Sequence, residues 1–293
     1  MAVLFSETQL NYARKKFYGK FYTIKDNLKD LNFLQKLVNK TLIFLYLTKY
    51  TLVNFKRKIY RFINILFNKK SGKKIINFSL NLDEQSTQKA SKDLKLNNFT
   101  FIENFLSQES YQYLINNWPN INYFNHNKKI IKHYNSIINW QAKNNYNKIN
   151  GALRLKIFYK FLLSEEFKKF FDNLMEFKKK NYQITSISSS MATKGSFLIP
   201  HIDGVYKNKK EIEDYNFIYF LDGHDENPSL GGGTGFYKDN EFKSPIFIPH
   251  TIKNSLVIYN QSEEFYHGFK MIECPKNIYR KTVNFRIATT DNL

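Results

Sequence analysis

Two side chains that can bind a metal, His201 and Asp203, close an apolar, strand-like run that begins at Phe197. Side chains two residues apart on a strand project from the same face, so both can contact one ion without a bend in the backbone. A third ligand is available downstream, at His267. Two imidazoles and one carboxylate on one side of a metal leave its opposite side open, which is typical of non-haem Fe(II) sites. We therefore predict His201, Asp203 and His267 as metal ligands and as the catalytic centre.

A row of polar side chains follows in a strand-like segment, where alternation would place four of them on one face: Arg280, Thr282, Asn284 and Arg286. Such a row is costly against a dry core, and a polar ligand would explain it. The Arg280 guanidinium can hold a carboxylate by two hydrogen bonds, and the Thr282 hydroxyl can bond the same group. A cosubstrate with a distal carboxylate and a metal-chelating head, such as 2-oxoglutarate, would bridge Arg280 and the metal. A salt bridge at the rim explains Arg286 equally well.

The order His-x-Asp, distal His, then Arg-x-Thr resembles the Fe(II)/2-oxoglutarate-dependent dioxygenases over roughly Asn97 to Ala288. The run Gly231-Gly-Gly-Thr-Gly-Phe236 is similar to a hairpin of their prolyl-4-hydroxylase-like branch. The resemblance implies an α+β fold: a double-stranded β-helix (jelly-roll, cupin-like) core with flanking helices. It also implies Fe(II), 2-oxoglutarate and O2 as cofactors, and hydroxylation of a C–H bond with release of succinate and CO2. Halogenating relatives carry a small residue where this chain has Asp203, so a hydroxylase is indicated.

The substrate does not follow from this resemblance. His267 and Arg280 are 13 residues apart, which is longer than in many members, and the prolyl-hydroxylase branch often has Lys in place of Arg280. We expect a small-molecule substrate or a carbohydrate- or lipid-linked one. One alternative is a nucleic-acid demethylase of the AlkB type, whose Arg-x-Asn-x-Thr-x-Arg signature is similar with its middle residues exchanged. The other is a non-catalytic, metal-binding jelly-roll module at a membrane.

The remaining histidines lack the context of His201 and His267: His126, His133, His224 and His250. His224 lies in a polar, turn-forming run and is interpreted as a loop residue. His250 follows a proline in a turn, which suggests a structural role or a place near the site entrance.

The charge of the chain is concentrated at its start. Residues 1–74 hold 17 Lys or Arg and three acidic residues, and so carry +14 of the formal net charge of +20. We predict a basic, amphipathic helical extension over residues 1–74, a polar linker over 75–96 and the dioxygenase domain over 97–293.

The basic extension has three alternative roles. Its apolar run at residues 42–47 is far too short to span a bilayer. Aromatic and aliphatic residues interleaved with Lys and Arg fit all three roles. We rank packing of the extension on the catalytic domain first, peripheral contact with an anionic membrane second and nucleic-acid binding last.

The single cysteine, Cys274, excludes an intrachain disulfide and favours a reducing compartment. We expect a cytoplasmic location, with a peripheral place at the membrane as the alternative.

Local patterns predict the elements of the domain. A first strand is expected from Phe99, and a helix capped by Ser107 that runs to about Asn117. Residues 118–150 are Asn-rich and are predicted to be an irregular or helical insertion. One helix is predicted over 155–180, with strands from Tyr182 to the end.

Overall fold

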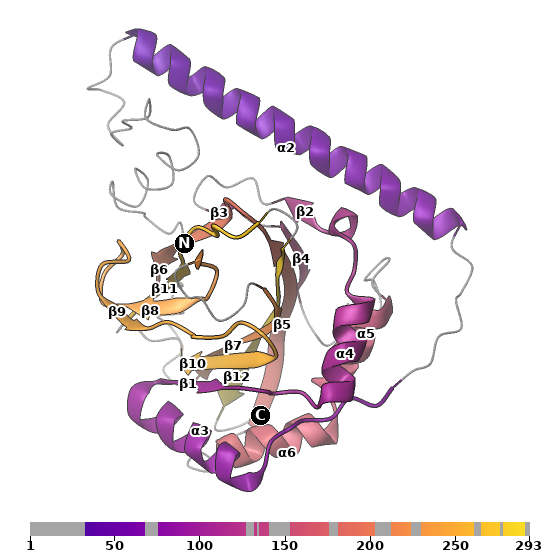
Figure 1. Ribbon diagram of the computed structural model, residues 1–293, viewed down its shortest axis with the longest axis vertical. Coiled ribbons are helices and arrows are strands. Elements are labelled where there is room, and N and C mark those ends of the chain that lie inside the picture. Colours follow the sequence, from indigo (N-terminus) through magenta and orange to yellow (C-terminus); the bar gives the residue numbers. More distant parts are fainter. Residues whose placement is uncertain are drawn as a thin grey trace.

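Two antiparallel β-sheets form the core of the protein (Figure 1). The structure, a computed structural model, describes residues 33–67, 76–126, 132–133, 135–140, 153–175, 181–202, 212–223, 230–260, 265–275 and 278–290. Within these ranges the larger sheet has the strand order β1 (Phe99–Ile102), β10 (Ser255–Asn260), β7 (Ile212–Asp222), β12 (Arg280–Thr290), β5 (Asn181–Ala192), β4 (Asn135–Trp140) and β2 (Asn125–His126). The smaller sheet has the order β3 (Lys132–His133), β6 (Phe197–His201), β11 (Tyr266–Phe269), β8 (Gly235–Tyr237) and β9 (Pro245–Phe247).

From β5 onward the chain passes back and forth between the two sheets. Strands β5, β7, β10 and β12 lie in the larger sheet, and β6, β8, β9 and β11 in the smaller one. Apolar side chains from both sheets pack together between them, among them Phe220, Val257 and Phe236. The α+β class predicted from the sequence is confirmed.

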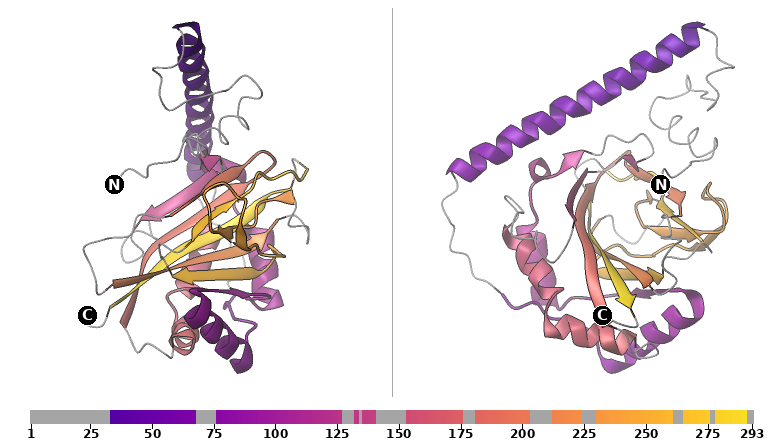
Figure 2. Two further views of the ribbon diagram at one scale, coloured as in Figure 1. Left: turned by 90° about the vertical axis from the view of Figure 1, so that its left-hand side faces the viewer. Right: turned by 180° about the vertical axis from the view of Figure 1, so that it is seen from behind.

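Helices cover the outer face of the larger sheet (Figure 2). They are α3 (Glu84–Asn97), α4 (Gln108–Asn117), α5 (Leu153–Phe161) and α6 (Glu165–Leu174). Strand β12 shows how the alternation of its side chains divides the sheet. Val283, Phe285 and Ile287 are buried in the core formed with these helices, whereas Arg280 and Asn284 line a cavity on the inner face. Along β12, one face therefore supports the fold and the other carries polar groups.

The predicted first strand and the Ser107-capped helix are confirmed as β1 and α4. Most of the range expected as a polar linker, 75–96, lies in helix α3, which spans Glu84–Asn97. Asp83 caps this helix by accepting a hydrogen bond from the Ser86 amide, 2.7 Å away. The buried stripe of α3 is made largely of small or polar side chains, so its amphipathic pattern is weak: Thr87, Ala90, Ser91 and Leu94.

Two further predictions are wrong in the described residues. The 118–150 segment contains the 3-10 helix η3 (Ile121–Tyr123) and strands β2, β3 and β4 where an irregular or helical insertion is expected. Strand β4 exists because β5 offers it a full partner, which its own Asn-rich sequence does not reveal. The helix predicted over 155–180 is divided into α5 and α6, and Ser164 caps the second by accepting from the Phe167 amide.

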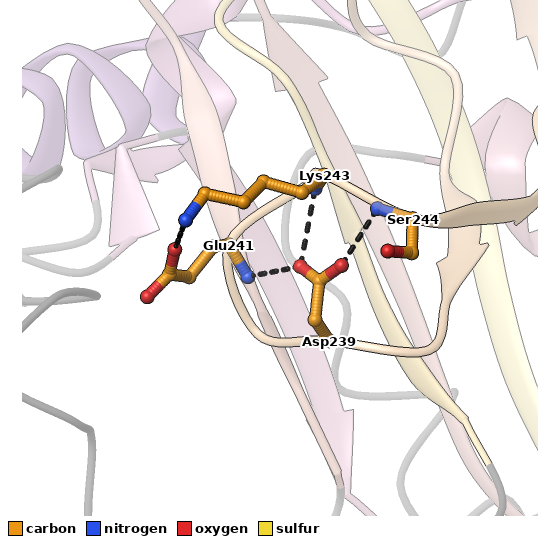
Figure 3. Close-up of polar contacts among 4 residues, drawn as sticks. All are labelled: Asp239, Glu241, Lys243 and Ser244. Carbon is orange, nitrogen blue, oxygen red and sulfur yellow. Dashed lines mark hydrogen bonds and ion pairs between the residues drawn. The ribbon is translucent and has the colours of Figure 1, made fainter.

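The run from Gly231 to Phe236, which resembles a hairpin in sequence, leads into β8, the first strand of the β8–β9 hairpin. Gly231 has φ +77°, and a Cβ there would lie 2.2 Å from the Met271 carbonyl oxygen. The turn of the β8–β9 hairpin lies downstream and is organised by Asp239 (Figure 3). Its carboxylate accepts hydrogen bonds from the amides of Glu241, Lys243 and Ser244.

Before the first strand of the domain, helix α2 (Phe33–Phe67) runs along η3 and β2 (Figure 1). The described residues include no helix that is both long enough and apolar enough to cross a bilayer.

Asn254 is a buried connector whose loss should destabilise the domain. Its Oδ1 accepts from the Leu106 amide and the Tyr219 hydroxyl, both 3.0 Å away, and its Nδ2 donates to the Leu106 carbonyl at 2.9 Å. Burial raises the pKa of Tyr219, so this hydroxyl remains a donor. We expect Asn254→Ala to lower the free energy of unfolding by about 3 kcal/mol, because the buried partners lose their hydrogen bonds.

Denaturant unfolding measures this effect, and Asn104→Ala is the matched control. Both asparagines have positive φ, 45° at Asn254 and 50° at Asn104, but Asn104 is exposed. Asn104→Ala should lower the free energy of unfolding by only about 1 kcal/mol, because it removes only the preference of asparagine for the left-handed conformation. Equal losses in the two variants would contradict a role for the buried hydrogen bonds.

Candidate metal centre

His201 and His267 face each other across two neighbouring strands of the smaller sheet. They are direct register partners in the antiparallel β6–β11 pair, and their ring centroids are 4.4 Å apart. Both are buried, with 5% and 7% of their surface exposed. Two imidazoles at this separation can bind one metal ion between them.

Gly268 makes this approach of the strands sterically allowed. A Cβ at this position would lie 2.6 Å from the Leu198 carbonyl oxygen and 2.8 Å from the Pro200 nitrogen. The register also shifts between His267 and Phe269, which accommodates the close approach. The glycine that follows the distal histidine in sequence is therefore required by the backbone.

A hydrogen bond to the backbone orients the first imidazole. His201 Nδ1 lies 2.8 Å from the Ile199 carbonyl oxygen, which can only accept, so Nδ1 carries the proton. In this tautomer Nε2 carries the lone pair, which is the form that ligates metals. Tyr259 packs beside the second imidazole, with ring centroids 5.2 Å apart.

The third predicted ligand, Asp203, lies outside the described residues. Within the part of the chain that the structure describes, no group of three His, Cys, Asp or Glu side chains could hold a metal. The buried, oriented histidine pair fits a borderline transition metal such as Fe(II), and Asp203 follows His201 by two residues.

Arg280 lines the same cavity as the two histidines and is only 4% exposed. Its Nε donates to the Gly232 carbonyl, and its Nη2 donates to Thr234 Oγ1 at 2.9 Å. Its guanidinium carbon lies 4.4 Å from the Phe269 ring centroid and 5.2 Å from that of Phe220. These contacts hold a positive charge in an apolar surrounding, where its attraction for an anion is strong.

Thr282 contacts the Arg280 and Ser190 side chains. Its Oγ1 is 2.5 Å from Ser190 Oγ and accepts from Arg280 Nη1 at 3.4 Å. The residue is fully buried, and it is not among those that line the cavity. The structure therefore shows Thr282 in contact with Arg280, and a direct bond from Thr282 to a cosubstrate stays a prediction.

The cavity between the histidines and Arg280 has a volume of about 280 Å³. One wall is polar, and only its β12 residues were predicted from the sequence. It combines Arg286 and Asn284 of β12 with Asn216 of β7 and with three alternate serines of β5: Ser186, Ser188 and Ser190. The Ser-Ile-Ser periodicity of β5 was the available signal, but it became meaningful only once β5 was seen to pair with β12.

The other histidines do not join this site in the described residues. His250 is exposed, and its Nε2 lies 3.1 Å from the Glu103 carboxylate. His126 is buried under helix α2, where the Tyr50 ring stacks on it. The side chain of His133 and all of His224 lie outside the described residues.

Comparison with known proteins gives matches among solved structures. No family profile and no curated protein matches the chain. A prolyl hydroxylase from Trichoplax adhaerens, in complex with a hypoxia inducible factor oxygen degradation domain peptide fragment, is 16% identical with a TM-score of 0.45, covering 71% of this chain and 90% of its own. A 2OG-Fe(II) oxygenase family oxidoreductase from Burkholderia pseudomallei is 12% identical with a TM-score of 0.48, covering 75% and 100%.

A prolyl-4-hydroxylase from Pseudomonas putida is 9% identical with a TM-score of 0.44, covering 70% of this chain and 99% of its own. These neighbours belong to the class of oxygenases that the sequence motifs resemble.

The histidine pair should govern metal binding. We expect His201→Ala and His267→Ala each to weaken Co(II) binding at least about 100-fold, because each removes one ligand. Anaerobic titration of the visible Co(II) absorption measures the affinity. The exposed His250→Ala is the matched control and should bind as the wild type does. Unchanged affinity in either site variant would refute the assignment.

Proposed function

We propose that this protein is an Fe(II)- and 2-oxoglutarate-dependent oxygenase that hydroxylates a C–H bond of a small polar or carbohydrate- or lipid-linked substrate. The observation that carries the proposal is one cavity lined by both a buried histidine pair and buried Arg280. A metal site alone fits many proteins. A metal site that shares a cavity with an arginine suited to a carboxylate fits a chelating diacid.

The spacing of Phe269 and His267 along β11 supports this cosubstrate. The Arg280 guanidinium stacks on Phe269, which is two residues from His267 on β11. Two strand residues span about 7 Å. A five-carbon diacid has the reach to chelate a metal at the histidines and to place its far carboxylate at Arg280.

Each protein group then has a definite task. His201, His267 and Asp203 would hold Fe(II), which together with 2-oxoglutarate and O2 supplies the C–H oxidation, with succinate and CO2 as the other products. Arg280 binds the far carboxylate, and Thr282 and Thr234 hold the guanidinium in place. The aromatic rings of Phe220 and Phe269 keep water from that end.

The architecture is consistent with this activity. Strands that alternate between two facing antiparallel sheets, from β5 to β12, are the arrangement of a double-stranded β-helix, and we interpret the core in this way. We retain residues 97–293 as the oxygenase domain and propose that α3 belongs to it, because its buried face packs on β1 and α6.

The polar wall of the cavity supports a polar substrate. Arg286 Nε donates to Asn216 Oδ1 at 3.2 Å, and these two residues are register partners on β12 and β7. Asn216 is in turn the register partner of Tyr259, which packs on His267. The wall therefore lies at the level of the histidines, where the oxidised carbon of a substrate must be placed.

Two buried atoms of this wall have unused hydrogen-bonding capacity. Among the described residues, neither Asn216 Nδ2 nor Asn284 Oδ1 has a hydrogen-bond partner. Buried polar atoms are normally satisfied, so a ligand with both donors and acceptors is favoured here. With Arg286 beside them, we propose that the substrate carries hydroxyl groups or a carboxylate.

Arg280 should determine cosubstrate affinity. Anaerobic addition of Fe(II) and 2-oxoglutarate should produce a visible charge-transfer band in the wild type. We expect Arg280→Lys to raise the 2-oxoglutarate requirement at least about tenfold, because the fork geometry is lost. Arg280→Ala should raise it further.

Lys281→Ala is the matched control for this experiment. Lys281 is the next residue on β12 and forms an ion pair with Asp222 at 2.7 Å on the other face. It should leave the 2-oxoglutarate requirement unchanged. The absence of a charge-transfer band in the metal-loaded wild type would refute the proposed cosubstrate site. Equal effects of Arg280→Ala and Lys281→Ala on the 2-oxoglutarate requirement would refute it as well.

Asn284 should affect the binding of the substrate and not the binding of the cosubstrate. A panel of hydroxylated and carboxylated small molecules is first screened for stimulation of succinate formation by the wild type. For a compound that stimulates, we expect Asn284→Leu to raise KM roughly tenfold, the value of one hydrogen bond to a buried group. The charge-transfer titration with 2-oxoglutarate should not change. A stimulating panel made only of apolar compounds would contradict the polar wall.

A further inference from the structure

Helix α2 contacts the sheets with its polar face. Asn54 forms two hydrogen bonds with the backbone of His126. Its Nδ2 donates to the His126 carbonyl at 3.1 Å, and its Oδ1 accepts from the His126 amide at 2.7 Å. The Tyr50 ring stacks on the His126 ring with centroids 3.6 Å apart. One turn further along, Arg57 Nη1 donates to the Phe124 carbonyl at 3.1 Å, and Arg61 Nη1 donates to that of Tyr123 at 3.2 Å.

Large apolar side chains of α2 between Phe44 and Ile63 are exposed on the other side. Phe44 is 67% exposed, Leu52 63%, and Phe55 and Phe62 61% each. At 3.6 residues per turn these positions form a stripe roughly opposite the contact face. The members of this stripe are Phe44, Leu45, Leu52, Phe55, Ile59, Phe62 and Ile63. A helix of a globular protein normally buries its apolar face on the core, and here the orientation is reversed.

The charges of α2 indicate the kind of surface that the apolar stripe binds. The helix has no acidic residue and seven basic ones. Exposed Lys56 and Lys49 flank the stripe on one edge, and exposed Lys58 flanks it on the other. An apolar band bordered by lysines fits the boundary between anionic headgroups and acyl chains. A nucleic-acid surface would place the cations at the centre of the band, where this helix has phenylalanine and leucine.

We propose that α2 is an interfacial membrane helix, which places its apolar stripe in an anionic lipid surface while its polar face holds the β-sheet domain. The stripe enters the headgroup region, and Lys49, Lys56 and Lys58 contact lipid phosphates or carboxylates. The inference is independent of the oxygenase assignment, because it uses no residue of the cavity.

The test is co-sedimentation of the full chain with phosphatidylcholine vesicles, with and without one quarter phosphatidylserine. The wild type should bind the anionic vesicles at least tenfold more tightly than the neutral ones. Phe55→Ser combined with Phe62→Ser should reduce binding to anionic vesicles at least tenfold. Lys56→Glu combined with Lys58→Glu should abolish the preference for phosphatidylserine.

Matched controls are available elsewhere on the surface. Leu96 and Leu163 are also exposed, at 67% and 49%, and Leu96→Ser with Leu163→Ser should leave vesicle binding unchanged. Circular dichroism and the melting temperature of all variants should match those of the wild type.

Three outcomes would overturn the proposal. One is a wild type that stays in the supernatant with anionic vesicles. Another is a concentration-dependent dimer that Phe55→Ser with Phe62→Ser dissociates, with no vesicle binding, which would make the stripe a contact between copies. The third is salt-sensitive binding to RNA or DNA in place of vesicles.

Discussion

The close pairing of β6 with β11 is the constraint on which the site depends. Any side chain at position 268 would collide with the Leu198 carbonyl and the Pro200 nitrogen, so a glycine is needed for the strands to come together. Once they do, the register places His267 opposite His201. A slip of one residue would turn His267 to the other face of the sheet and separate the two ligands. The metal site is thus a consequence of backbone packing as much as of side-chain chemistry.

The opposite end of the cavity poses an electrostatic problem, because a cation taken out of water loses its hydration. Arg280 regains part of that loss through the Gly232 carbonyl, two threonine hydroxyls and two aromatic faces. A bound carboxylate would contribute a full opposite charge to this guanidinium. Because the same cavity is also lined by the two histidines, this supports the proposed binding of a small diacid.

The sequence was sufficient for features that depend on local periodicity. The alternation in β12 and the spacing around His201 were visible without a structure, and so was the helix that Ser107 caps. The contributions of Ser188 and Asn216 to the polar wall were not visible, because β5 and β7 become neighbours of β12 only in the folded sheet. The break at Ser164 was readable in principle, since a serine followed by Glu165 and Glu166 is a helix start. Helix α3 was harder, because its buried stripe is mostly small or polar.

The two proposals are connected through the larger sheet. Helix α2 contacts His126 on β2, β2 pairs with β4, β4 pairs with β5, and β5 carries the serines of the polar wall. A helix lying on a lipid surface would therefore hold the β2–β4 edge of the sheet next to that surface, only two strands from the cavity wall. A substrate that is polar where it is oxidised and lipid-linked elsewhere satisfies both ends of this path. Binding of a freely diffusing metabolite would explain the cavity but would not explain the exposed apolar stripe of α2.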